Sequence, residues 1–356
     1  MRVFSTFSGI GGFEVGIQNA FEATRTIQGR PSPTSTDSER ADIPRQPLCV
    51  GYSEIDKYAI SVYEGHFPGV KNYGDITKIN AAELPDFDCL VGGFPCQSFS
   101  IAGKRRGFED TRGTLFFDLA RILKEKQPRL FVFENVKGLL SHDKGRTLIT
   151  ILAAIDELGY DCQWQVLNSK NHGVPQNRER IIIVGHLRGT SRPEVFPLTT
   201  NTKADNVLPT LTARYHGAQA NGGYIGHEST EDRSTVKVQE ATQKGYAVAG
   251  VGDSINLAQI DSKTRRDRVG KGIANTLTAT AMEQHTLTSD MKIRRLTPLE
   301  CERLQAFPDN WTKYGVVGYE FSMPITKEIS DSQRYKMCGN AVTTNVIQAV
   351  FERIFA

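Results

Sequence analysis

One short stretch, residues 87–100, constrains the fold of this chain more than any other. Phe87 to Val91 is an apolar run with the length and composition of a buried strand, and two glycines end it. Pro95 fixes its own φ, so the turn that follows is rigid. Cys96 therefore comes just after the carboxyl end of a strand, where open α/β sheets place ligands and chemistry. We expect an α/β fold organised around this edge.

Cys96 also has a simpler interpretation. A lone Cys in an intracellular protein is usually a small buried apolar residue. A packed core Cys, however, needs neither the turn nor the polar Gln97 and Ser98 beside it, so the pattern favours a reactive thiol. The six cysteines of the chain are scattered without C-x-x-C spacing, so we expect no disulfide framework and no metal site. A reducing cytoplasm fits this cysteine usage.

Composition limits the function classes. A chain of 356 residues with 39% apolar content can bury a sizeable core and suits one large domain with a smaller one. The net charge of +3 is too mild to indicate nucleic-acid binding by itself, and if the chain binds DNA its positive charge must be local. Since the chain has no long apolar run and enters a motif at its N-terminus, we expect no signal peptide and no membrane span.

A Gly-rich turn, Phe7 to Phe13, joins a predicted strand at residues 2–7 to a predicted helix at residues 14–21. Glycines let the backbone approach a ligand closely, and the N–H groups at a helix N-terminus suit an anionic group such as a carboxylate. The turn lacks the full G-x-G-x-x-G spacing, which argues against a nicotinamide cofactor.

Two acidic residues follow the next predicted elements. Glu54 comes after a strand predicted at residues 49–53, where a carboxylate can accept both hydroxyls of a ribose. It could instead cap the helix predicted at residues 57–66, a role that Asp56 can fill equally well. Asp75 lies in a Gly-Asp pair, which in isolation is more often only a turn.

An acid and two arginines extend the predicted active edge. A strand at residues 130–133 delivers Glu134 beside the strand that precedes Cys96, which meets the geometric demand for a paired nucleophile and acid. Arg178 and Arg180 lie two residues apart at the entry to an apolar strand, so they share one face and can point into one cleft. A surface ion pair with Glu179 is the alternative for both arginines.

Three segments lack the hydrophobic pattern of a sheet or helix. Residues 22–47 are predicted to form a surface loop. Residues 101–112 are polar and basic, which suits either a lid over bound DNA or a solvated loop. From residue 187 to about residue 291 the composition favours a loop-rich module with short strands. This module contains the densest basic cluster, which can read bases or hold phosphates and consists of Lys263, Arg265, Arg266 and Arg268.

Taken in order, these motifs resemble those of the DNA cytosine-5 methyltransferases of bacterial and phage type. The matches include PCQSFS around Cys96, ENV at Glu134 and QNRER at residues 176–180. Matches to the Gly loop, the G-D-I turn, the capped helix after Thr297, a Thr-Leu pair at Thr276 and the late GNAV turn extend the series over nearly the whole chain. One departure is Ser5, where the family often has an acid whose contact water or another group would have to replace.

The resemblance implies a Rossmann-like S-adenosylmethionine-dependent sheet and a smaller, loop-rich target-recognition domain. We place the large domain at residues 1–187, the small domain at 188–325 with its recognition region at 188–291, and a segment returning to the large domain at 326–356. Expected cofactor contacts are Phe7, Gly9, Ile10, Gly11, Gly12, Glu54, Ile55, Asp75, Ile76, Pro95, Asn340, Ala341 and Val342. Expected DNA contacts are Gln97, Ser98, Lys104, Arg105, Arg106, Arg265, Arg266, Arg268 and Thr276.

The resemblance also implies the chemistry. Cys96 adds to carbon 6 of a cytosine flipped out of double-stranded DNA, and carbon 5 takes the methyl group. Glu134 holds or donates a proton at ring nitrogen 3, Arg180 orients Glu134 and the cytosine carbonyl, and Arg178 lies near the base and its backbone.

We expect a cytoplasmic monomer. Methylation of tRNA, and DNA binding by a regulator that has lost catalysis, are the alternative functions. The sequence leaves open the target site and whether a restriction endonuclease shares it.

Overall fold

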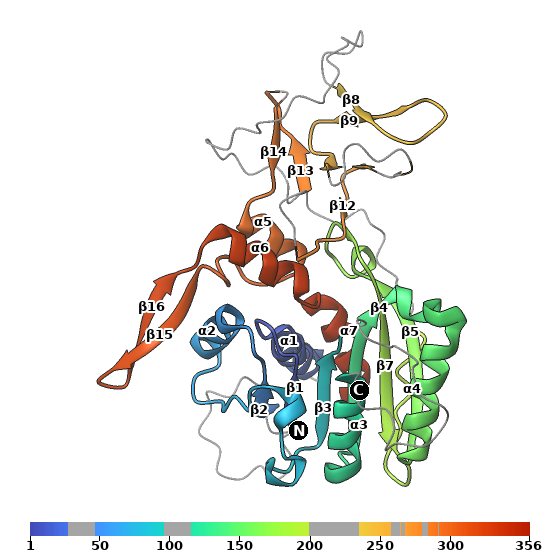
Figure 1. The fold of residues 1–356 in the computed structure, drawn as a ribbon, viewed down its shortest axis with the longest axis vertical. Helices are drawn as coiled ribbons and strands as arrows, with labels where there is room; N and C mark the ends of the chain where they lie inside the picture. The colour runs from blue at the N-terminus through green and yellow to red at the C-terminus, as the bar shows by residue number, and fades with distance from the viewer. Residues whose placement is uncertain are drawn as a thin grey trace.

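The computed structural model describes residues 1–27, 47–95, 115–198, 235–257, 264, 268–279, 284–290 and 292–356. Its largest unit is a six-stranded sheet in the order β2-β1-β3-β4-β7-β5 (Figure 1). The strands of this sheet are β1 (Arg2–Thr6), β2 (Leu48–Ser53), β3 (Cys89–Gly93), β4 (Leu130–Val136), β5 (Tyr160–Asn168) and β7 (Glu179–Leu187). Strands β1 to β4 are parallel, whereas β7 runs antiparallel to both β4 and β5. The predicted α/β fold is confirmed.

Helices cover both faces of this sheet. On one face, α3 (Leu115–Lys126) and α4 (Arg146–Glu157) pack their apolar sides on alternate strand residues such as Phe131. On the other, α1 (Gly12–Ile27) and α7 (Thr344–Phe355) pack on the residues between, such as Val132. Because side chains alternate across a strand, each strand contributes to both cores. The last helix of the chain therefore lies against the first, and both termini belong to this unit (Figure 1).

The loop predicted at residues 22–47 is wrong at its start. Helix α1 continues to Ile27, and β2 begins at Leu48. The polar composition hid this last turn and a half, in which the Thr24 and Thr26 hydroxyls donate to carbonyl oxygens four residues earlier. Residues 28–46 lie outside the described part of the chain.

The small part of the molecule has short strands, as its composition predicts. A four-stranded sheet has the order β11-β10-β13-β14, and β8 pairs with β9 in a separate hairpin. Strand β12 pairs in parallel with β6, which lies just before β7, and so joins this module to the large sheet. The bounds are β6 (Gln176–Asn177), β8 (Thr235–Gln239), β9 (Tyr246–Gly250), β10 (Ser254–Asn256), β11 (Val269–Gly270), β12 (Ala274–Asn275), β13 (Gln284–Leu287) and β14 (Ile293–Arg295).

Two helices lie between this module and the large sheet. Helix α5 (Pro298–Leu304) begins at the predicted capping box, in which Thr297 and Glu300 each bond the other's backbone N–H. Helix α6 (Asp331–Asn340) packs on α5 around a small apolar core. Between them, the hairpin of β15 (Tyr314–Glu320) and β16 (Met323–Glu328) projects outward (Figure 1).

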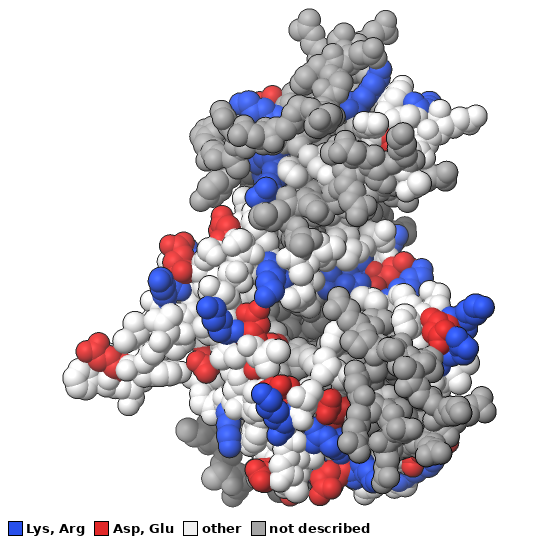
Figure 2. All heavy atoms as spheres, viewed as in Figure 1, with Lys and Arg blue, Asp and Glu red and all other residues white. Residues whose placement is uncertain are grey.

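The remaining elements are short. Helix α2 (Lys57–His66) follows β2 with Asp56 as its N-cap. The 3-10 turns are η1 (Ile76–Lys78), η2 (Ala81–Glu83), η4 (Lys137–Leu140), η5 (His142–Gly145) and η6 (Ser169–Asn171). Within the described ranges, no helix has the length and hydropathy needed to cross a membrane. On the face drawn in Figure 2, the described Lys and Arg residues are interspersed with Asp and Glu rather than gathered in one patch.

Candidate active site

The carboxyl ends of β3 and β4 bring the predicted acid beside Gly93, three residues before Cys96 in the sequence. Gly93 is the register partner of Glu134 in this parallel pair. A side chain at Gly93 would begin 2.9 Å from the Glu134 Oε2 atom, so only a glycine leaves this carboxylate its place.

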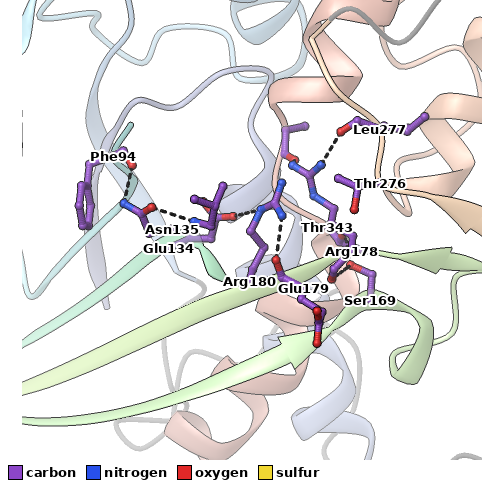
Figure 3. Close-up of polar contacts among 12 residues, drawn as sticks. Phe94, Glu134, Asn135, Ser169, Arg178, Glu179, Arg180, Thr276, Leu277 and Thr343 are labelled. Atoms are coloured by element: carbon purple, nitrogen blue, oxygen red, sulfur yellow. Dashed lines mark hydrogen bonds and ion pairs between the residues drawn. The ribbon is translucent and has the colours of Figure 1, made fainter. Parts of the chain in front are cut away.

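Asn135 fixes the backbone just before Cys96. It is buried, and its side-chain amide donates a 2.9 Å hydrogen bond to the carbonyl oxygen of Phe94 (Figure 3). Phe94 is itself buried in the large core, while Pro95 is exposed. Cys96 lies outside the described residues, and the described backbone that precedes it is fixed at Phe94, next to Glu134.

Glu134 forms an ion pair with Arg180. The Nε atom of Arg180 lies 2.8 Å from Oε1 of Glu134, and the two side chains are only 15% and 13% exposed (Figure 3). Arg180 also donates to the carbonyl oxygen of Glu179. The second carboxylate oxygen of Glu134 makes no hydrogen bond within the described part of the chain. The pair therefore holds a carboxylate in one orientation with one oxygen available to a ligand.

Arg178 does not join this pair. Its side chain is 3% exposed, and its guanidinium donates to the carbonyl oxygens of Leu277, Gly339 and Ala341 (Figure 3). Burial lowers the pKa of Arg178 to about 9, which leaves it charged at neutral pH. The alternative of a surface ion pair with Glu179 is also wrong.

Lys137 is the ion-pair partner of Glu179, with Nζ 2.9 Å from Oε2. The Nη atoms of the buried Arg178 guanidinium donate to backbone carbonyl oxygens, so in this structure they are already bonded to the protein. The side chains of Arg178 and Arg180 thus point toward different partners.

At the far side of the sheet edge, the Gly-rich turn is held by Glu54. The backbone N–H of Gly9 donates to Oε2 of Glu54 at 2.9 Å. The N–H groups of Ile55 and Asp56 donate to its other oxygen. These three donors fill three of about four acceptor positions on a carboxylate and leave one for a ligand. The helix cap is Asp56, which bonds the N–H groups of Tyr58 and Ala59.

The remaining residues expected at the cofactor differ in their exposure. Ile55 is 73% exposed, Ile10 and Ile76 are buried, and Gly12 packs against Val342. Asn340 is exposed at the end of α6, and Ala341 is buried. Phe7 and Gly11 turn the backbone through positive φ. Ser5 is fully buried in β1.

Asp75 caps the short turn η1. Its Oδ1 atom accepts hydrogen bonds from the N–H and the hydroxyl of Thr77, and these bonds hold the pKa of Asp75 below its usual range. Asp75 is therefore ionised and can accept a further hydrogen bond.

The structure buries one of the predicted DNA contacts. Arg268 is 1% exposed, and its guanidinium donates to the carbonyl oxygen of Asn256. Thr276 is half-buried and donates to the carbonyl oxygen of Asn177, which leaves its hydroxyl oxygen able to accept. The other expected DNA contacts lie outside the described residues and are Gln97, Ser98, Lys104, Arg105, Arg106, Arg265 and Arg266.

Three positioning residues were missed from the sequence. Gln176 is fully buried and accepts from the N–H of Leu277 while donating to the carbonyl oxygen of Leu304. Trp311 donates to the carbonyl oxygen of Ile10 in the Gly-rich turn. The Asn72 side chain accepts from the backbone N–H of Glu54 and donates to its carbonyl oxygen. Gln176 is the first residue of the QNRER motif, so the sequence offered a signal for it, but the charged residues of the motif received the attention.

The residues around Glu54 suit S-adenosylmethionine, and one observation supports this. A large apolar side chain, Ile55, is exposed next to a fixed carboxylate with an acceptor position to spare. An apolar surface beside a hydrogen-bond acceptor is what an adenosine group requires.

Known proteins resemble this chain over its full length. Residues 1–356 match the C-5 cytosine-specific DNA methylase family. The Type II methyltransferase M1.ScrFI of Lactococcus lactis subsp. cremoris is 37% identical over 99% of this chain and 77% of its own length. The Type II methyltransferase M.HhaI of Haemophilus parahaemolyticus is 34% identical over 98% of this chain and 93% of its own.

Solved structures share the fold. The Dnmt2 methyltransferase of S. pombe superimposes with a TM-score of 0.64 at 16% identity, covering 99% of this chain and 97% of its own. The family match and the Type II relatives decide between the functions left open above, in favour of DNA and against a regulator without catalysis. The chain belongs to the C-5 cytosine-specific DNA methylases and is an S-adenosylmethionine-dependent DNA cytosine-5 methyltransferase.

Proposed function

We propose that this enzyme methylates a cytosine that is flipped out of a specific duplex sequence and joined for a time to Cys96. The observation that carries the proposal is the Glu134–Arg180 ion pair at the sheet edge, next to the backbone that leads to Cys96. S-adenosylmethionine supplies an activated methyl group when bound.

Carbon 5 of cytosine is a poor nucleophile, so the protein must push electron density into the ring. Addition of the Cys96 thiolate to carbon 6 does this, because carbon 5 then behaves like an enamine. Glu134 holds or donates a proton on its second oxygen at ring nitrogen 3 as the thiolate adds, and takes the proton back when the thiolate leaves. Arg180 fixes Glu134 and places positive charge where the ring becomes negative. Loss of the carbon 5 proton and expulsion of the thiolate complete the turnover.

This chemistry requires an unstacked base, since both ring faces are covered in a duplex. We propose that residues 101–112 and the recognition region hold the opened duplex, with the Thr276 hydroxyl turning from the Asn177 carbonyl oxygen to donate to a DNA phosphate. We further propose that the enzyme is a cytoplasmic monomer. In this proposal, Glu54, Asp75 and the turn at Asn340 surround the cofactor. A restriction endonuclease that cuts the same site is the partner that the Type II relatives suggest.

The test begins with the target sequence. Bisulfite sequencing of plasmid DNA, incubated with the protein and S-adenosylmethionine, identifies the methylated cytosine. A duplex with 5-fluorocytosine at that position should then form a protein–DNA complex that survives denaturing electrophoresis. Cys96→Ala should lose this complex and methyl transfer but still bind the duplex.

Cys162→Ala is the matched control, because burial raises the pKa of that thiol to about 12 and Cys162 lies nearer the opposite end of the strands from Glu134. It should keep the complex. A Cys96→Ala enzyme that still methylates DNA would refute the nucleophile assignment.

The cofactor assignment has its own test. Glu54→Ala should weaken S-adenosylhomocysteine binding at least about tenfold, because charge-assisted hydrogen bonds contribute about 1.5–3 kcal/mol each. Isothermal titration calorimetry measures this affinity. An unchanged affinity would remove Glu54 from the cofactor site.

A further inference from the structure

Arg178 is a buried cation without an ion-pair partner within the described part of the chain. Its two Nη atoms donate to three backbone carbonyl oxygens, at 2.8 Å to Leu277, 3.2 Å to Gly339 and 2.8 Å to Ala341. The Nε atom is buried and makes no hydrogen bond. A cation held only by carbonyl dipoles is sensitive to where those carbonyls lie, because their partial charges replace its hydration.

The three carbonyls come from two segments that are distant in sequence. Leu277 follows Thr276 in the recognition region, whereas Gly339 and Ala341 flank Asn340 at the end of α6. These segments also touch directly. A side chain at Gly339 would begin 2.0 Å from the Thr278 carbonyl oxygen, so the backbones lie in contact at this point.

The residues at the start of β7 also belong to this junction. Gln176 accepts from the N–H of Leu277, and Thr276 donates to the carbonyl oxygen of Asn177, so the residues before β7 are tied to the recognition region. Arg180, two residues after Arg178, holds Glu134. Figure 3 shows the two guanidinium groups leaving this segment toward different partners. One short segment thus contacts the recognition region, the late turn and the catalytic acid.

We propose that Arg178 is a positioning residue that couples cofactor binding to DNA binding, by fixing the Leu277 segment to the Gly339–Ala341 turn. This inference rests on the proposed roles of Thr276 toward DNA and of Asn340 toward the cofactor. Movement of either segment changes the carbonyl cage around one cation. A ligand that orders one segment therefore spares the other ligand part of the ordering cost.

The experiment measures the ratio of DNA dissociation constants without and with saturating S-adenosylhomocysteine, using the target duplex and fluorescence anisotropy. We expect a ratio of about 5 to 150 in the wild-type protein, the usual range of coupling between sites. Arg178→Met should bring the ratio close to one. Arg178→Lys should lower it nearly as far, since a single ammonium cannot donate in the same fork to three carbonyls.

Arg268→Met is the matched control. Arg268 is also buried in the recognition region, and its guanidinium donates to the Asn256 carbonyl oxygen, so its loss should lower stability and leave the ratio unchanged. A purely structural role for Arg178 would weaken both affinities and keep their ratio. If Arg178→Met does not fold, Arg178→Lys and Gly339→Ala carry the test, since the added methyl group at Gly339 separates the two backbones.

The outcomes are distinct. A wild-type ratio of one, or a wild-type ratio retained in folded Arg178 or Gly339 variants, overturns the inference. A wild-type protein that fails to bind or methylate the duplex counts instead against the proposed function.

Discussion

The two parts of this molecule use arginine–carboxylate pairs for different purposes. At the edge of the large sheet, Glu134 receives one contact from Arg180 and keeps its second oxygen unbonded within the described ranges. In the small part, both oxygens of Glu300 accept from Arg294, and one also accepts from the N–H and the hydroxyl of Thr297, which makes four bonds. A carboxylate with all its acceptor positions filled can only hold a structure together. A carboxylate with one free position can meet a substrate.

The largest expected effect breaks the pair at the sheet edge. Glu134→Gln should lower methyl transfer by about 10²–10⁴-fold, because general acid–base catalysis contributes that much. The fold should remain, since the amide is isosteric and Arg180 keeps an oxygen to bond. Transfer of a radiolabelled methyl group to the target duplex and a thermal melt measure the two quantities.

Glu300→Gln should show the opposite result. Its melting temperature should fall, while the folded enzyme should transfer methyl groups at nearly the wild-type rate. If Glu134→Gln instead melts far below the wild-type protein and Glu300→Gln loses rate without loss of stability, the assignment of the two pairs is wrong.

Sequence reasoning was strongest where hydrophobic periodicity and strand ends determine structure. Apolar runs such as Phe87 to Val91 predicted the sheet, and the strand end at Glu134 predicted its acid. It did not predict the burial of Arg178 and Arg268, which depends on carbonyl groups in other segments of the chain. A basic residue in a polar segment has the same local pattern whether it faces DNA or a backbone carbonyl. Only the tertiary contacts distinguish the two.

The next largest effect breaks the pair in the small part. Arg294→Met should lower the free energy of unfolding by about 3–5 kcal/mol, because it leaves the Glu300 carboxylate buried without its cation. Urea denaturation followed by fluorescence measures this loss. Arg294→Met combined with Glu300→Leu should recover much of it, since removing both charges removes the desolvation cost. A double variant no more stable than Arg294→Met would show that packing, rather than charge burial, accounts for the loss.

The smallest effect concerns Arg268, the basic residue of the recognition region that the structure buries. Arg268→Met should cost about 1–3 kcal/mol of stability, because the hydrogen bond to the Asn256 carbonyl oxygen is lost while the apolar part of the side chain is kept. The salt dependence of DNA binding should not change. Each phosphate contact contributes about 0.9 to the slope of log K against log salt concentration, and a guanidinium enclosed by protein contributes none. Anisotropy titrations of the target duplex at several salt concentrations give this slope for both proteins. A slope that falls by about one in the variant would mean that Arg268 leaves its buried position to hold a phosphate, and the contrast between the two parts of the molecule would then fail at this residue.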